Sequence, residues 1–146
     1  MTTVQNKFLG DKDFVETLIP QRFPFVMVDK LYSYSETELV SGFTIQVDAI
    51  FFKKDCLVEA GLIEHMAQSV ALHTGYQFYL KSEQAPTGYI GSIKEIEIIK
   101  LPRLDEEIRT TVSILQEFGG ITLVNVVTTL NDVEIAKGQM KTVLAK

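Results

Sequence analysis

The chain has 146 residues, of which 46% are hydrophobic and 23% charged, a composition typical of a globular domain and not of a disordered or fibrous chain. It carries 14 Lys and Arg against 19 Asp and Glu, so its net charge of −5 excludes the positive surface that nucleic-acid binding requires. One cysteine and two histidines form no metal-ligand pattern, and we expect neither a metal nor a cofactor. With a polar N-terminus and no apolar run of the ~20 residues that span a membrane, we expect a single cytoplasmic domain, residues 1–146.

The first part of the chain predicts a short helix followed by a β-hairpin. Asp11 is a good N-cap and Pro20 disfavours helical geometry at the residue before it, so we expect a helix from Asp11 to Leu18. The segments Phe25–Tyr34 and Glu38–Val47 are rich in β-branched and aromatic residues and are separated by a polar turn. We expect them to be two strands of a hairpin.

A long helix is predicted from about Leu57 to Leu80. This stretch is rich in Leu, Ala, Met, Glu, His and Gln and contains few β-branched residues. Its apolar residues cover most of the helix circumference, which is typical of a helix enclosed by other structure.

The rest of the chain consists of extended segments joined by short turns: Thr87–Lys100, Glu107–Phe118, Ile121–Leu130 and Val133–Leu144. In the second of these, alternate residues are apolar, which predicts one dry and one wetter face of the sheet. Strands on both sides of one buried helix predict an α+β fold, with a curved, mostly antiparallel sheet of about five or six strands around the helix.

Three short motifs occur in this order of elements. Residues 18–30 read Leu-Ile-Pro-Gln-Arg-Phe-Pro-Phe-Val-Met-Val-Asp-Lys, residues 64–68 read Glu-His-Met-Ala-Gln, and residues 88–93 read Gly-Tyr-Ile-Gly-Ser-Ile. Together they resemble the hot-dog fold dehydratases that act on 3-hydroxyacyl groups carried by acyl carrier protein. The similarity is greatest to the dehydratase-like branch found in aryl polyene and flexirubin pigment pathways. The resemblance extends over about residues 18–140 and implies a hot-dog fold and lyase chemistry of the fatty acid biosynthesis type.

The resemblance also implies a division of roles between two subunits. Water is eliminated from a 3-hydroxyacyl thioester by a histidine of one subunit and a carboxylate on the central helix of the other, one group taking the C2 proton while an acid protonates the departing hydroxide. Glu64 stands at the carboxylate position, whereas Gln21 stands where the family has the histidine. A glutamine forms hydrogen bonds but does not titrate near neutral pH, so Gln21 is expected to orient a thioester or water without transferring a proton.

The histidines of the chain do not replace the missing one. His65 and His73 point about 100° and 180° away from Glu64 around the predicted helix, so neither shares its face. We expect both to be structural. Gln68 lies one turn after Glu64 and is expected to fix that carboxylate or to contact the thioester, with a purely structural buried amide as the alternative.

The remaining substrate-binding candidates lie at the helix start and in the first motif. Backbone N–H groups near Gly61 and Leu62 are the expected donors to the enolate-like oxygen. Arg22, Phe23 and Pro24 belong to the string expected to face the substrate. For Arg22 the structural alternative is an ion pair that ties this string to a carboxylate such as Asp29 or Glu64.

Three functions remain open for a chain that acts on or binds a 3-hydroxyacyl or enoyl thioester of acyl carrier protein or coenzyme A. The first is a dehydratase in which Glu64 does most of the proton transfer. The second is a non-catalytic acyl-binding subunit, or one half of a heterodimer whose related subunit supplies the histidine. The third is a thioesterase in which Glu64 activates water. The resemblance implies a homodimer with two composite sites, the heterodimer being the alternative.

Overall fold

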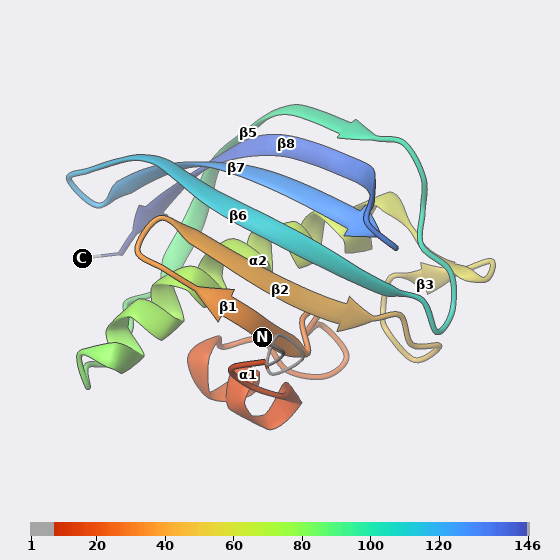
Figure 1. The fold of residues 1–146 in the computed structure, drawn as a ribbon, viewed down its shortest axis with the longest axis horizontal. Coiled ribbons are helices and arrows are strands. Elements are labelled where there is room, and N and C mark those ends of the chain that lie inside the picture. The colour runs from red at the N-terminus through yellow and green to blue at the C-terminus, as the bar shows by residue number, and fades with distance from the viewer. Residues whose placement is uncertain (1–7, 146) are drawn as a thin grey trace, which may run out of the picture.

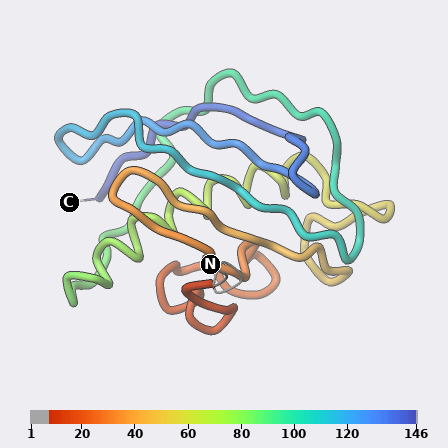
Figure 2. The backbone as a smooth tube through the Cα atoms, viewed as in Figure 1, coloured from red at the N-terminus to blue at the C-terminus, as the bar shows by residue number. Residues whose placement is uncertain are grey.

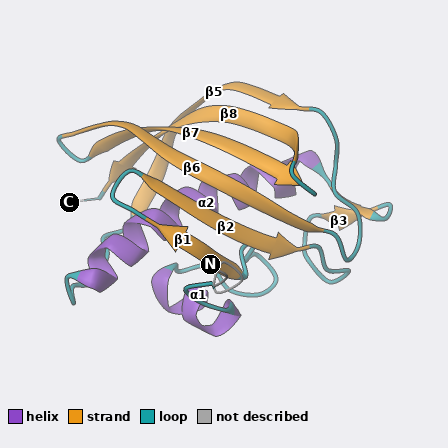
Figure 3. Cartoon of the chain, viewed as in Figure 1, coloured by secondary structure: helices purple, strands orange, loops and turns teal. Residues whose placement is uncertain are grey.

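The computed structural model describes residues 8–145, and its main feature is a six-stranded antiparallel sheet curved around one long helix (Figure 1). The elements in chain order are α1 (Lys12–Leu18), β1 (Lys30–Tyr34), β2 (Glu38–Thr44), β3 (Phe52–Lys53), β4 (Cys56–Leu57), α2 (Glu59–Leu80), β5 (Gly88–Ile98), β6 (Glu107–Phe118), β7 (Ile121–Leu130) and β8 (Val133–Leu144). The strand order is β1-β2-β6-β7-β8-β5, and β3 and β4 form a separate two-stranded sheet. Figure 3 shows the sheet curving over α2. This is the α+β arrangement that the sequence predicted.

The N-terminal helix begins and ends where its sequence signals lie. Asp11 Oδ1 accepts a hydrogen bond from the Phe14 N–H at 3.1 Å, which caps α1. The helix ends at Leu18, and its C-cap Ile19 has an extended backbone, as expected for a residue that precedes proline.

Several predicted boundaries differ from the structure: β2 ends at Thr44 and not at Val47, and β5 is shorter than predicted at both ends. The expected strand Phe25–Tyr34 starts only at Lys30, because the backbone groups of Phe25 and Met27 bind side chains of α2 instead of a neighbouring strand. The central helix starts at Glu59 and not at Leu57, because Leu57 is paired with Phe52 as part of strand β4. The short β3–β4 hairpin was not predicted.

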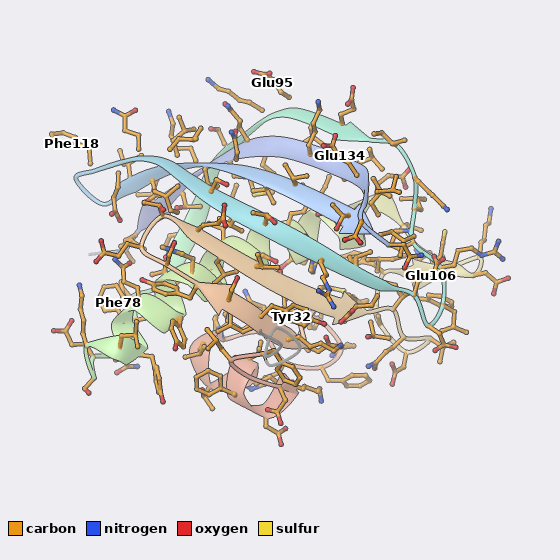
Figure 4. The ribbon with its side chains drawn as sticks, viewed as in Figure 1. Tyr32, Phe78, Glu95, Glu106, Phe118 and Glu134 are labelled. Carbon is orange, nitrogen blue, oxygen red and sulfur yellow. The ribbon has the colours of Figure 1, made fainter. Side chains whose placement is uncertain are left out.

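The last three strands have the predicted bounds. Their turns use left-handed backbone, with φ of 61° and 82° at Gly119 and Gly120 and of 51° and 66° at Asn131 and Asp132. Phe118, at the end of the β6–β7 hairpin, projects away from the body of the molecule and is 82% exposed (Figure 4).

The core lies between the sheet and α2, and it contains polar as well as apolar groups. In β6 the residues Ile108, Thr110 and Val112 are buried while Arg109 is exposed, which confirms the predicted dry and wet faces. The buried residues of α2 are Gly61, Leu62, His65, Met66, Gln68, Ser69, Val70, Leu72, His73 and Gly75. The helix therefore places four hydrogen-bonding side chains beneath the sheet.

Strand β5 forms one edge of the sheet and β1 forms the other (Figure 2). Along β5, Tyr89, Ile90 and Ile93 are 61%, 40% and 41% exposed. This edge therefore presents unpaired backbone groups and apolar side chains together. Within residues 8–145, neither helix has both the length and the apolar character needed to cross a membrane.

Candidate active site

A cavity of about 470 Å³ opens between α2, the end of α1, the start of β5 and the segment that joins α1 to β1, residues 19–29, here called the connector. Three of the predicted site residues, Gln21, Glu64 and Gln68, line it. Its apolar wall includes Leu18, Ile19, Val70, Pro86, Ile90 and Leu144. The cavity therefore combines an apolar wall with a carboxylate and two amides.

The carboxylate of Glu64 is held by the amide of Gln68, its neighbour one helical turn later. Gln68 Nε2 donates to Glu64 Oε2 at 2.8 Å and to the Phe25 carbonyl at 2.9 Å, while its Oε1 accepts from the Met27 N–H at 2.6 Å. These contacts use both the donor and the acceptor side of the amide, so they fix its orientation. The contact between Gln68 and Glu64 that the sequence predicted is present.

His65 is fully buried beneath the sheet and is kept neutral. Its Nδ1 lies 2.7 Å from the Met27 carbonyl, which only accepts, so Nδ1 carries the proton. Its Nε2 therefore accepts from Thr110 Oγ1 at 2.7 Å, and Thr110 in turn accepts from Thr128 Oγ1 at 2.6 Å. Burial lowers the pKa of His65 to about 4. This ring is a structural element and has no free nitrogen to offer a substrate.

Met27 joins the two buried side chains. Its N–H binds Gln68 and its carbonyl binds His65, so one residue of the connector is tied to two successive turns of α2. The side chain that holds Glu64 is therefore anchored through the connector to the core. One feature of the sequence could have indicated this network, namely Thr110 on an otherwise apolar face of β6.

His73 also lies in the interior, away from the cavity. Its Nε2 lies 3.0 Å from the Ser35 carbonyl, and its ring stacks on Tyr34 with a centroid distance of 4.9 Å. Burial lowers its pKa. Both histidines of the chain are thus committed to the core, and neither lines the cavity.

Gln21 reaches the cavity because the end of α1, just before it, lies directly on α2. A Cβ added at Gly75 would lie 2.2 Å from the Leu18 carbonyl oxygen, so only glycine at this helical position permits the contact. Gln21, three residues after Leu18, lines the same cavity as Glu64. This contact was not predicted from the sequence.

Arg22 supports the connector and does not line the cavity. Its Nη1 donates to the carbonyls of Ile19 and Gln21, both at 2.8 Å, and its Nε lies 3.6 Å from Glu16 Oε1. The suggested ion pair with Asp29 is wrong, since Asp29 binds the adjacent lysine instead. Arg22 thus ties the connector to a carboxylate of α1.

The other predicted residues lie outside this cavity. The N–H groups of Gly61 and Leu62 donate to the Val58 carbonyl at 2.9 and 3.1 Å, so in this arrangement they are engaged within the helix start. Phe23 and Pro24 line a separate cavity of about 160 Å³. In the part of the chain that the structure describes, no group of three or more His, Cys, Asp or Glu residues is placed to hold a metal ion.

Comparison with known proteins gives a family and a fold. A family model described as ApeP-like, ApeP dehydratase, matches residues 14–144. No match was found among curated protein sequences. Among solved structures, the chain is similar to the dehydratase heterocomplex ApeI:P from Xenorhabdus doucetiae, with a TM-score of 0.83 and 15% identity over 90% of this chain and 91% of that one.

Two further solved structures are similar over most of their length. One is a hypothetical thioesterase with coenzyme A from Streptococcus pneumoniae TIGR4, with a TM-score of 0.64 and 10% identity over 79% of this chain and 84% of that one. The other is the PaaI protein of E. coli, from the phenylacetic acid degradation operon, with a TM-score of 0.63 and 10% identity over 77% and 80% of the two chains. The predicted hot-dog fold is confirmed.

Proposed function

The chain belongs to the ApeP-like family of hot-dog dehydratases, which is related to aryl polyene biosynthesis, and from this premise we propose that it is one subunit of a heteromeric 3-hydroxyacyl-thioester dehydratase. In this assembly Glu64 provides the carboxylate of one composite site. A related subunit provides the histidine that faces it.

One observation carries the proposal: the cavity holds an oriented carboxylate, whereas both histidines of the chain are bound inside the core. Dehydration needs one group that removes the C2 proton and another that protonates the leaving hydroxide. Glu64 can serve as one of these two proton-transfer groups, because Gln68 fixes the orientation of its carboxylate. A homodimer of this chain would carry Gln21 at both histidine positions, so neither of its two composite sites would contain the second proton-transfer group.

The exposed edge of the sheet favours assembly with another subunit. Strand β5 begins at the cavity, because Gly88, Tyr89 and Ile90 belong to its lining. A second subunit paired along β5 would therefore approach the cavity and cover the apolar side chains of the edge. The similar structure from Xenorhabdus doucetiae is a dehydratase heterocomplex, ApeI:P, which supports this arrangement.

The substrate class follows from the family and from the shape of the site. We propose a 3-hydroxyacyl or 2-enoyl thioester of acyl carrier protein or coenzyme A. The apolar wall of the cavity suits the acyl chain, while Glu64 lies beside Gln68 at its polar part.

The test measures hydration of a trans-2-enoyl thioester by the loss of its enoyl absorbance. The samples are the chain alone, a histidine-bearing subunit of the same family from the same organism alone, and the two mixed. We expect activity only in the mixture, and we expect Glu64→Gln to lower it by roughly 10²–10⁴-fold. Glu59→Gln is the matched control, because Glu59 lies in the first turn of the same helix outside the cavity.

Two results would contradict the proposal. Full activity of the mixture that carries Glu64→Gln would remove this carboxylate from the chemistry. Release of free thiol by the chain alone, abolished by Glu64→Gln, would identify a thioesterase. Activity gained by Gln21→His in the chain alone would instead support the proposal, because it would show that the site lacks only the histidine.

A further inference from the structure

A chain of hydrogen bonds crosses the core from β7 to the cavity. Thr110 and Thr128 are register partners on the buried faces of β6 and β7, and their hydroxyl oxygens lie 2.6 Å apart. Thr110 Oγ1 lies 2.7 Å from His65 Nε2, and His65 Nδ1 lies 2.7 Å from the Met27 carbonyl. The Met27 N–H binds Gln68 Oε1 at 2.6 Å. The sheet is thus joined, through His65 and the connector, to a residue that lines the cavity.

Each group in this chain of bonds has a fixed role as donor or acceptor. Because the Met27 carbonyl only accepts, His65 donates to it through Nδ1 and accepts from Thr110 through Nε2. The Met27 N–H donates to Gln68 Oε1, which leaves Nε2 of the same amide to donate to Glu64 Oε2 at 2.8 Å. A change of role at one group would leave its neighbour without a partner.

The polar groups of this chain lie where apolar side chains would otherwise pack. His65, Thr110 and Thr128 are fully buried, and Ile108 and Val112 flank Thr110 on the same face of β6. Buried polar groups lower stability unless each of them finds a partner, and a fully satisfied network specifies one arrangement of the segments that it joins. Here that arrangement is the position of Met27 against α2.

The orientation of the Gln68 amide decides what Glu64 meets. With its nitrogen toward Glu64 the amide donates a hydrogen bond, whereas with its oxygen toward Glu64 two acceptors would face each other and the carboxylate would turn away. The Met27 N–H and the Phe25 carbonyl select the first orientation. His65 in turn holds Met27, so the ring stands two steps from the carboxylate.

Resting on the proposed function, we propose that His65 is a positioning residue of the dehydratase: through Met27 it holds Gln68 in the orientation that donates to Glu64. The ring itself touches no substrate, since both of its nitrogens are bound inside the core. A catalytic group displaced by about 1 Å loses up to roughly a hundred-fold in rate. Loss of the donor to Met27 therefore acts on kcat and not on KM.

The test measures kcat and KM for hydration of a trans-2-enoyl thioester by the chain mixed with its histidine-bearing partner subunit. His65→Leu, which removes the donor to Met27, is expected to lower kcat roughly ten- to a hundred-fold and to leave KM near its native value. His65→Asn has an amide that donates to the Met27 carbonyl in place of Nδ1, so it is expected to keep most of the native kcat. Ser41→Ala is the matched control, because it removes another buried hydrogen bond between the sheet and α2, to Ser69 at 2.7 Å, and is expected to keep the native kcat.

A double-mutant cycle separates positioning from general damage to the core. Because His65 acts through Gln68, His65→Leu combined with Gln68→Leu should lower kcat no further than Gln68→Leu alone. If His65→Leu is not folded by circular dichroism, Thr110→Val takes its place, since it removes the hydroxyl that binds His65 Nε2 at little change in shape. Thr110→Val is expected to lower kcat at unchanged KM, and Thr110→Ser, which returns the hydroxyl, to restore it.

The contrary outcomes separate this inference from the proposed function. The inference is wrong if His65→Leu keeps the native kcat, if its loss appears in KM instead, or if His65→Asn loses as much as His65→Leu. It is also wrong if the two losses of the double-mutant cycle multiply. In each of these cases the proposed function stands, provided that Glu64→Gln still lowers the activity. If the native mixture is inactive, both are overturned.

Discussion

Gly75→Ala tests how tightly the end of α1 packs against α2 at this glycine. The added Cβ would lie 2.2 Å from the Leu18 carbonyl oxygen, and since real Cβ atoms are not found closer than 3.0 Å to such atoms, the backbone must retreat by about 0.8 Å. The obstacle is backbone, which cannot turn aside as a flexible side chain does. Overpacking of this kind costs up to about 3 kcal/mol. The better helix propensity of alanine returns about 1 kcal/mol.

We therefore expect a net loss of about 2 kcal/mol in the free energy of unfolding, and a melting temperature lower by about 6 °C. Urea unfolding and thermal melts followed by circular dichroism measure both quantities. The matched control is Gly88→Ala, where the nearest atom to the added Cβ is Leu144 Cδ2 at 3.6 Å, and a change within about 0.5 kcal/mol is expected. A Gly75→Ala variant as stable as the native chain would refute the reasoning.

Three further predictions concern the polar groups beneath the sheet and in the cavity. Burial lowers the pKa of His65 to about 4, below its unfolded value of about 6.5. Between these two pH values the unfolded state binds more protons than the folded state, so the free energy of unfolding must fall as the pH drops through this range. His65→Gln should flatten the slope of unfolding free energy against pH, and an unchanged slope would be inconsistent with the buried neutral ring. Thr110→Val should lower the free energy of unfolding in urea by about 1–3 kcal/mol, because it leaves His65 Nε2 without a donor. The control Thr111→Val, on the opposite face of β6, should change it by less than about 0.5 kcal/mol. Gln68→Leu should lower kcat of the assembled dehydratase, because Glu64 loses the amide that orients it, and an unaltered kcat would argue against that role.

The sequence predicted best what depends on local chemistry. Asp11, Pro20 and the turn residues Gly119 and Asn131 act within a few residues of themselves, and the structure has α1 and the last three strands at the expected places. The i, i+4 spacing of a helix likewise sufficed to pair Gln68 with its carboxylate.

What the sequence did not predict depends on contacts between distant segments. Residues 25–29 have the composition of a strand, but Met27 is 41 residues from Gln68 and 38 from His65, and these side chains take the hydrogen bonds that a strand would have made. The partner of Arg22 could not be chosen from several nearby carboxylates without the path of the connector. The same holds for Gln21, which lines the cavity with Glu64 only because the end of α1 packs against α2.

The burial of both histidines has a practical consequence for chemical modification. Reagents such as diethyl pyrocarbonate react with imidazole nitrogens that are exposed and unprotonated, and in His65 both nitrogens are hydrogen-bonded inside the core. His73 is likewise buried, with its Nε2 against the Ser35 carbonyl. In an assembled complex, rapid inactivation by such a reagent would therefore mark the imidazole of the other subunit. This chain would act as the unreactive half, and the modified residue could be located without labelling either protein beforehand.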